Sequence, residues 1–281
     1  MLGDPAALAA TVREMSERFF GRPGDAAGPG RAAAVALGWI APGPEGRLTP
    51  LGALAADSCR EHRFWEERGR LLPFETGAPP LTAGWFAGRT VVEIGCGMGA
   101  NLMSLEGLPG RRVGVEPVPL YRQIGETFRA ALGLAPLEIR EGGGEAIPAA
   151  DGEADVVLCV TAHQYMDLRR ALAEMGRALR PGGELVLIGG TLGAYLKGCA
   201  PARAKSDAIT VVNTLGYMAT GRRPIAARGA STTSRPIYPT VAWMTRLLRA
   251  SGFTLEGRPF PIGAETCFLA RKAGTAGGLH A

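Results

Sequence analysis

The spacing of hydrophobic residues along this 281-residue chain changes near residue 80. Before that point apolar side chains recur every three or four positions, as at Leu8, Val12, Met15 and Phe19, which predicts short helices over about residues 5–72. Residues 38–40 and 47–49 read as short strands around a Pro/Gly turn, and a helix is predicted near 51–58. Residues 1–80 are therefore predicted to form a mostly helical, winged-helix-like domain, ending in a linker at 76–81.

Beyond residue 80, short β-branched runs alternate with helical patterns. The predicted strands are 91–94, 113–116, 137–140, 156–160, 185–188, 253–256 and 266–270, and the predicted helices are 118–132, 167–179 and 241–250. Such alternation predicts parallel strands joined by crossover helices, hence an open α/β sheet over residues 81–281. The segment 190–237, rich in Gly, Thr and Arg, is predicted to be irregular, and the tail from Gly274 is predicted to be loose.

Composition supports one substantial core with a smaller satellite unit, because 46% of the residues are hydrophobic. The longest apolar runs fall short of the ~18 residues that a membrane-spanning helix needs, so no membrane partner is expected. The N-terminal residues lack the basic start and apolar centre of a secretory signal, which predicts a cytoplasmic protein. The five cysteines are scattered without a C-x-x-C pair, so neither a disulfide framework nor a metal site is expected.

The net charge of +5 belongs to one part of the chain. Residues 1–80 carry nine basic and ten acidic residues, whereas residues 191–237 carry seven basic residues and one acidic residue, Asp207. A positive field over 191–237 could attract an anionic substrate or nucleic acid, and the alternative is an ordinary solvated loop.

The most informative stretch is 91–102, a predicted strand that ends in a G-x-G-x-G loop and continues into a helix. Glycine permits the sharp turn and removes the Cβ atoms that would keep a ligand away from the backbone, so a ligand is predicted at the carboxyl end of this strand. The loop alone also fits a dinucleotide fingerprint. Gly99 and Glu93 favour a cationic ligand over a pyrophosphate, and Glu116 ends the next strand, where a carboxylate can accept ribose hydroxyls.

With these motifs in this order, the sequence resembles the class I S-adenosylmethionine-dependent methyltransferases over about residues 85–272. Further matching segments are 141–148 (EGGGEAIP), 161–164 (TAHQ) and 179–183 (LRPGG). The resemblance implies a Rossmann-like, seven-stranded, mostly parallel sheet with a final antiparallel strand. It also implies S-adenosylmethionine as cofactor and S-adenosylhomocysteine as product.

The resemblance carries a set of cofactor-binding residues onto this chain. They are Glu93, Gly95, Cys96, Gly97, Gly99, Asn101, Glu116, Pro117, Gly144, Glu145 and Thr161. The family commonly uses an acidic residue to contact the adenine amine, whereas this chain has Gly143 there. Backbone groups of Gly144 and Glu145 are expected to substitute for it. Cys96 is interpreted as a small loop residue and not as a nucleophile.

Two candidates for catalysis follow the fourth predicted strand. His163 could act as a general base, or it could simply line the acceptor pocket. Tyr165 is the second candidate, with core packing as its alternative role. The acceptor atom stays open: an oxygen nucleophile would profit from a base, whereas an amine or thiol would mainly need alignment and desolvation.

The segment 190–237 occupies the place where many small-molecule methyltransferases of this family carry a substrate lid. The residues expected to line it are Tyr195, Tyr217, Arg222, Arg223 and Tyr238. The resulting prediction is methyl transfer to an anionic or aromatic small molecule, in specialised metabolism.

Three alternatives remain open. The N-terminal domain could bind DNA in a regulator that senses S-adenosylmethionine, although its net charge of −1 suits dimerisation or substrate capping better than phosphate contact. The basic segment 191–237 could bind RNA as the methyl acceptor, although no RNA-binding module is recognisable. The cofactor could also support an internal cyclisation instead of methyl transfer.

Overall fold

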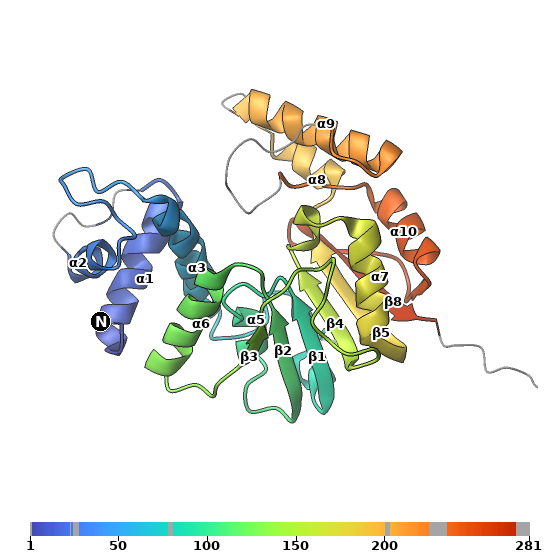
Figure 1. Ribbon diagram of the computed structural model, residues 1–281, viewed down its shortest axis with the longest axis horizontal. Coiled ribbons are helices and arrows are strands. Elements are labelled where there is room, and N and C mark those ends of the chain that lie inside the picture. Colours follow the sequence, from blue (N-terminus) through green and yellow to red (C-terminus); the bar gives the residue numbers. More distant parts are fainter. Residues whose placement is uncertain are drawn as a thin grey trace, which may run out of the picture. The chain divides into compact units, whose positions relative to one another are not determined.

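A computed structural model describes residues 2–22, 24, 28–77, 81–199, 203–224 and 235–273 of the chain (Figure 1). The predictions for linker residues 78–80, for Arg228 in the basic segment and for the tail from Gly274 lie outside these residues. The chain folds into two compact units. The first comprises residues 1–88, 96–109 and 116–141, and the second comprises residues 89–95, 110–115 and 142–281.

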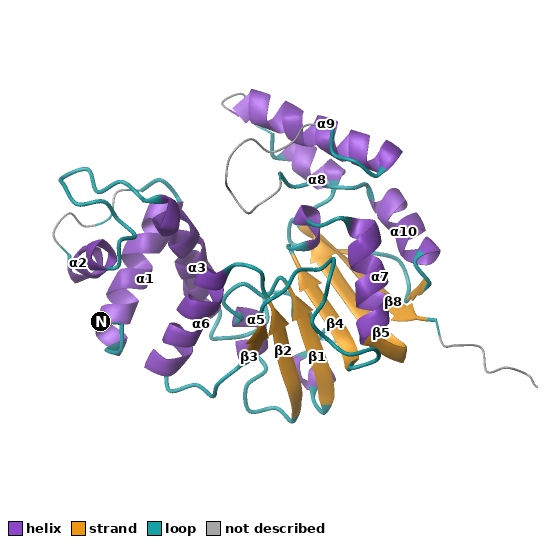
Figure 2. Ribbon diagram, in the orientation of Figure 1, coloured by secondary structure: helices purple, strands orange, loops and turns teal. Residues whose placement is uncertain are grey.

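The first unit is mostly helical (Figure 2). Its longer helices are α1 (Pro5–Phe19), α2 (Pro29–Ala36), α3 (Pro50–Glu67) and α6 (Pro119–Ala131), joined by the short helices α4 (Ala83–Phe86) and α5 (Ala100–Met103) and the strand β3 (Glu138–Arg140). Each longer helix begins with a proline, whose fixed φ and missing N–H suit the first helical position. The predicted helix at 51–58 therefore starts as expected but continues to Glu67.

Two glycines allow the close approach of backbones in the first unit. A Cβ atom on Gly30 would lie 2.2 Å from the carbonyl oxygen of Ala10, and one on Gly52 would lie 1.8 Å from that of Trp39. The two strands predicted at 38–40 and 47–49 reduce to one bridge between Ile40 and Leu48. The N–H groups of Trp39 and Ile40 donate to Ala34 O in α2 and are therefore not available to extend the pairing.

Eight strands of the described residues form one sheet, in the order β3-β2-β1-β4-β5-β8-β6 with β7 paired to β8. The parallel strands of the second unit are β1 (Arg89–Ile94), β2 (Gly110–Val115), β4 (Ala154–Val160) and β5 (Leu179–Gly189). The strands β6 (Phe253–Leu255), β7 (Phe260–Ile262) and β8 (Glu265–Lys272) are antiparallel additions. The short strand β7 brings the sheet to eight strands, one more than predicted.

The helices of the second unit follow the crossover pattern. The segment η1 (His163–Tyr165) is a single 3₁₀ turn, and the α-helices are α7 (Leu168–Ala178), α8 (Leu192–Lys197), α9 (Ala204–Thr220) and α10 (Val241–Ala250). The prediction of an irregular segment at 190–237 is wrong over α8 and α9. The side of α9 that is buried is polar, so the usual hydrophobic stripe of a helix that packs on a sheet is missing.

Candidate functional site

A glycine-rich loop joins β1 to α5. Gly95, Gly97 and Gly99 have φ angles of 69°, 58° and 89°, in the left-handed region that disfavours side chains. At Gly95 a Cβ atom would also lie 2.3 Å from the Cβ of Ala162. The predicted strand–loop–helix arrangement is therefore present, and its backbone conformation depends on these glycines.

Glu116 directly follows β2 and is buried. Its Oε2 accepts a hydrogen bond from Gly97 N at 3.0 Å, and its Oε1 accepts one from Val118 N at 2.8 Å. Burial raises the pKa of Glu116, and these two backbone donors oppose the rise because they favour the charged form. The Glu116 carboxylate thus connects the glycine loop to the segment containing Pro117. The ribose of the cofactor is predicted to bind beside this segment.

A second carboxylate beside the loop was not predicted from the sequence. Glu61 extends from α3, and a Cβ atom on Gly97 would lie 2.9 Å from its Oε2. Burial and the negative charges of Asp57 and Glu116 together raise the pKa of Glu61 to about 8, against a hydrogen bond from the Met98 backbone. Asp57 lies one turn earlier on α3, which explains why both carboxylates share one face of the helix.

Tyr121 on α6 extends this acidic group. Its hydroxyl donates to Asp57 Oδ2 at 3.1 Å, and Arg60 donates to Asp57 Oδ1 at 2.8 Å. Burial and the neighbouring charge of Asp57 raise the pKa of Tyr121, so its phenol stays protonated. A helical pattern in the sequence carries no signal for these contacts, because the partners come from α3 and α6.

The remaining residues predicted around the glycine loop are buried. Glu93 is 1% exposed near the end of β1, and Asn101 is buried in α5. The Cys96 thiol lies 3.8 Å from the carbonyl oxygen of Gly97, the geometry of a weak S–H donor. This contact agrees with the interpretation of Cys96 as a small loop residue.

The predicted adenine-side segment is a tight turn, closed by a bridge between Gly143 and Ala146. A Cβ atom on Gly144 would lie 2.3 Å from the sulfur of Met166, so this position has no room for a side chain. Glu145 Oε1 accepts a hydrogen bond from Asp167 N at 2.7 Å. The Glu145 carboxylate therefore holds the start of α7, and only its backbone is left for the predicted contact.

The segment after β4 combines strain with burial. Thr161 has a φ of 53°, uncommon for a β-branched residue, and its N–H donates to Ile188 O at 2.8 Å. His163 is 1% exposed and lies against Gly189, where a Cβ atom would be 2.2 Å from its Cε1. Burial lowers the pKa of His163 to about 4, so its imidazole is neutral at pH 7. Tyr165 is 41% exposed, which argues against core packing as its role.

Two of the five predicted substrate residues lie together. The rings of Tyr195 and Tyr238 stack with centroids 4.5 Å apart and planes 17° apart. The Tyr195 hydroxyl donates to Asp207 Oδ1 at 2.8 Å. Tyr195 comes from α8 and Asp207 from α9, so the two helices of the segment 190–237 together position this aromatic pair.

Two other predicted substrate residues, Tyr217 and Arg223, form hydrogen bonds within the protein. Tyr217 is 2% exposed, and its hydroxyl accepts from Leu168 N at 2.7 Å and donates to Asp167 Oδ1 at 3.0 Å. The guanidinium of Arg223 donates to three backbone carbonyl oxygens, those of Arg235, Met166 and Gln164. The donors of Arg223 are thus engaged by the protein, whereas the side chain of Arg222 is exposed to solvent.

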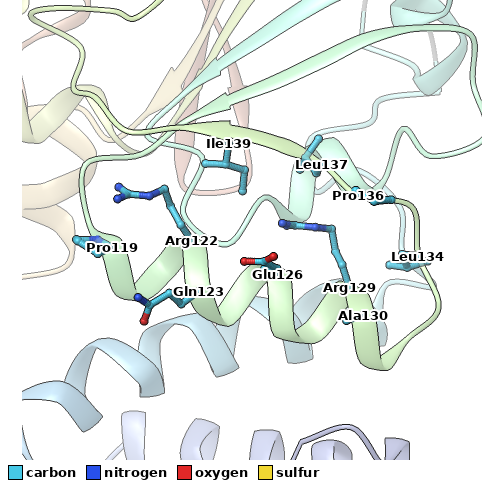
Figure 3. A pocket seen from close by; sticks show the side chains of 10 residues that line it. All are labelled: Pro119, Arg122, Gln123, Glu126, Arg129, Ala130, Leu134, Pro136, Leu137 and Ile139. Carbon is cyan, nitrogen blue, oxygen red and sulfur yellow. The ribbon is translucent and has the colours of Figure 1, made fainter.

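A cavity of about 480 Å³ lies in the first unit, between α6 and the segment leading into β3 (Figure 3). It is lined by Pro119, Arg122, Gln123, Glu126, Arg129, Ala130, Leu134, Pro136, Leu137 and Ile139. Arg122 donates to Glu116 O at 2.5 Å, and Arg129 donates to Met98 O at 3.2 Å. None of the lining residues is among the predicted site residues, but the cavity adjoins the glycine loop, since a Cβ atom on Gly99 would lie 2.8 Å from Cδ2 of Leu137.

The described residues contain no group of three or more His, Cys, Asp or Glu side chains that could hold a metal ion. None of the helices in the described part of the chain has the length and apolar character needed to cross a membrane.

Comparison with known proteins finds similarity to methyltransferases over part of the chain. Residues 92–187 match the family model described as a methyltransferase domain. The uncharacterized methyltransferase Rv3342 of Mycobacterium tuberculosis is 34% identical over 128 residues, which cover 44% of this chain and 49% of the relative. The uncharacterized methyltransferase YcgJ of Bacillus subtilis is 26% identical over 108 residues, 38% of this chain and 43% of the relative. The chain thus spans about half the length of the curated relatives it matches.

Solved structures show the same fold. PH0226 protein from Pyrococcus horikoshii superposes with a TM-score of 0.55 at 17% identity, over 74% of this chain and 91% of that one. A SAM-dependent methyltransferase from Methanosarcina mazei superposes with a TM-score of 0.50 at 18% identity, over 66% of this chain and 92% of that one. These likenesses establish the Rossmann-like sheet with its crossover helices.

Proposed function

Because residues 92–187 match a methyltransferase domain and the fold is that of S-adenosylmethionine-dependent methyltransferases, we propose that the protein transfers the methyl group of this cofactor to a small-molecule acceptor. One observation carries the proposal: the buried carboxylate of Glu116 accepts a hydrogen bond from Gly97 N, within a loop that contains three glycines with positive φ. The glycine loop after β1 leaves backbone groups accessible to a ligand, and the Glu116 carboxylate after β2 lies beside them.

The residues around the loop fit this cofactor. Glu61 and Glu116 lie beside Gly97, and Glu93 is buried near the end of β1. A cation bound beside Glu61 would favour the ionised form of its carboxyl. Such a surrounding suits the ammonium and sulfonium groups of S-adenosylmethionine better than the pyrophosphate of a dinucleotide. We assign Glu116 to the ribose, the loop Gly95–Gly99 to the amino acid portion, and the backbone of Gly144 and Glu145 to the adenine. The cofactor supplies an electrophilic methyl group on sulfur.

The side chains after β4 are assigned to the acceptor. A neutral, buried His163 is a weak base, so we propose that it shapes and orients the acceptor site instead of driving a difficult proton transfer. Tyr165, exposed at the same 3₁₀ turn, borders this site. Acceptors that need alignment and exclusion of water more than a strong base, such as amines and thiols, suit these residues.

The cytoplasmic location, the role in specialised metabolism and a dimerising or capping role of the N-terminal helices form part of the same proposal. They follow from the sequence pattern and from the family resemblance.

The test is to incubate the protein with methyl-labelled S-adenosylmethionine and an extract of its source organism. We expect the label in small metabolites and not in RNA or protein, and the labelled mass would identify the substrate. Label in RNA or protein would replace the small-molecule proposal by a macromolecular one. Tight cofactor binding without any labelled product would favour the cyclase or the regulator.

A further inference from the structure

A small glycine brings a tyrosine ring and a carboxylate together at the end of β5. Gly190 follows β5 directly, and Glu265 begins the neighbouring antiparallel strand β8, where Gly189 pairs with Thr266. A Cβ atom on Gly190 would lie 2.8 Å from Cδ1 of Tyr238 and 3.5 Å from Oε2 of Glu265. The ring and the carboxylate therefore border the same point on the backbone.

The tyrosine is held in place by its neighbours. Tyr238 stacks on Tyr195, and its N–H donates to Thr214 Oγ1 of α9 at 3.1 Å. Burial, together with the nearby phenols of Tyr165 and Tyr195 and the carboxylate of Glu265, raises the pKa of Tyr238 to about 12. Tyr238 thus stays a neutral phenol with an electron-rich face, surrounded by two more tyrosines and one carboxylate.

Among the described residues, the carboxylates of Glu265 and Asp207 lie beside this aromatic group. Glu265 Oε2 is buried and has no hydrogen-bond partner among the described residues, and no described Lys or Arg forms an ion pair with Glu265. The carboxylate nearest to Tyr195 is Asp207, to which its hydroxyl is bonded. A buried carboxylate oxygen without a donor is unfavourable unless it is protonated or a cation arrives to meet it.

We propose that Tyr195, Tyr238 and Glu265 bind a cationic group of the methyl acceptor, a protonated amine or a quaternary ammonium. Tyrosine faces attract cations through their quadrupole, and a carboxylate adds a charge-assisted hydrogen bond or ion pair. This inference rests on the proposed methyl transfer and specifies its substrate class. A cationic substrate takes the place of the anionic one expected from the sequence. The guanidinium of Arg223 donates to backbone carbonyl oxygens, and the side chain of Arg222 is exposed to solvent.

The position of this cation site fits a substrate anchor. His163 lies against Gly189, and Gly189 directly precedes Gly190. The cation site and the residue assigned to the acceptor therefore border consecutive backbone positions at the end of β5.

Charge-matched ligands test the proposal on the full chain. Saturation-transfer NMR with millimolar phenethylamine, phenylacetate and 2-phenylethanol compares a cation, an anion and a neutral molecule of similar shape. We expect binding of the amine and little binding of the other two. Glu265→Gln and Tyr238→Leu should each weaken amine binding about tenfold or more, whereas Tyr238→Phe, which keeps the ring, should retain it.

The matched control is Glu256→Gln, which removes an exposed carboxylate paired with Arg271 at 2.6 Å. It should leave amine binding unchanged. Equal or tighter binding of phenylacetate, absence of amine binding, or an unaffected Glu265→Gln variant would each overturn the cation site. Calorimetric binding of S-adenosylhomocysteine and the melting temperature are measured on the same samples. If the wild-type protein does not bind S-adenosylhomocysteine, the proposed methyl transfer is wrong. If it binds S-adenosylhomocysteine but not the amine, only the cation site is wrong.

Discussion

At the residue scale, single carboxylates border the glycine-rich loop, and Glu116 accepts hydrogen bonds from two backbone N–H groups there. Replacing Glu116 by alanine removes the carboxylate that is predicted to bind the ribose and that accepts the hydrogen bond from Gly97 N. We expect the dissociation constant for S-adenosylhomocysteine to rise about tenfold or more, measured by calorimetry. Glu256→Gln is the control, because Glu256 is an exposed carboxylate paired with Arg271 and lies outside the predicted cofactor residues. Unchanged affinity of the Glu116 variant would mean that the ribose is held elsewhere.

Glu61 makes a prediction about pH. Its pKa is about 8 in the folded protein and 4.5 in the unfolded chain, mainly because of burial. Between these values the folded state keeps a proton that the unfolded chain has lost, so this residue makes the free energy of unfolding fall as pH rises from about 4.5 to about 8. Glu61→Gln should remove that part of the fall, as measured by urea unfolding across the range.

The control for this prediction is Glu66→Gln, an exposed carboxylate on the same helix, paired with Arg70 at 3.0 Å. It should keep the pH dependence of the wild type. If Glu61→Gln also keeps it, the carboxylate of Glu61 is ionised and solvated in solution.

At the scale of elements, α9 reverses the usual distribution of side chains. Its buried residues are Asp207, Thr210, Asn213, Thr214 and Tyr217. On the opposite side, Val212 and Leu215 are 47% and 49% exposed. A helix with polar groups inward is stabilised by its hydrogen bonds to neighbouring elements, such as the one from Tyr238 N to Thr214 Oγ1.

A pair of adjacent substitutions tests this reversal. Thr214→Val keeps the side-chain volume but removes the acceptor of a buried N–H, so we expect a loss of about 1–2 kcal/mol in the free energy of unfolding. Leu215→Gln alters an exposed position and should change it by less than about 0.5 kcal/mol. Denaturant unfolding of both variants makes the comparison. A larger loss for Leu215→Gln than for Thr214→Val would mean that the apolar side of α9 is covered in solution.

At the scale of the whole molecule, each compact unit contains a buried neutral histidine. His62 in the first unit contacts the ring edges of Trp65 and Phe128, and its ring nitrogens have no hydrogen-bond partner among the described residues. Burial lowers the pKa values of His62 and His163 from 6.5 to about 4. Below pH 6.5 the unfolded chain binds protons that the folded protein excludes, so both histidines make stability fall as pH drops towards 4.

The substitution His62→Phe separates the two contributions. It keeps an aromatic ring in an aromatic surrounding and removes the titrating nitrogens. We expect a smaller loss of stability between about pH 6.5 and about pH 4 than in the wild type, with the part due to His163 remaining. Chemical unfolding at several pH values measures it. An acid loss equal to that of the wild type would place the sensitivity in other groups.

Much of the fold was predictable because its signals are local. The β-branched runs at 91–94 and 156–160 lie within the observed strands β1 and β4, and the helix predicted at 241–250 matches α10. The prediction failed over α8 and α9, where polar residues face inward and no hydrophobic period marks the helix. The roles of Arg223 and Tyr217 were equally hidden, since their partners are backbone and side-chain groups brought near only by folding.

By itself, the sequence determined the glycine loop, the carboxylate that ends the second strand and the parallel arrangement of strands. These depend on backbone freedom and on the alternation of short apolar runs, which neighbouring residues specify. Only the tertiary structure decided that Glu61 meets the glycine loop, that Arg223 supports backbone carbonyls and that Glu265 lies beside Tyr238. The physical reason is that burial, charge pairing and pKa depend on groups that are distant in the chain and become neighbours only when the sheet and its helices assemble.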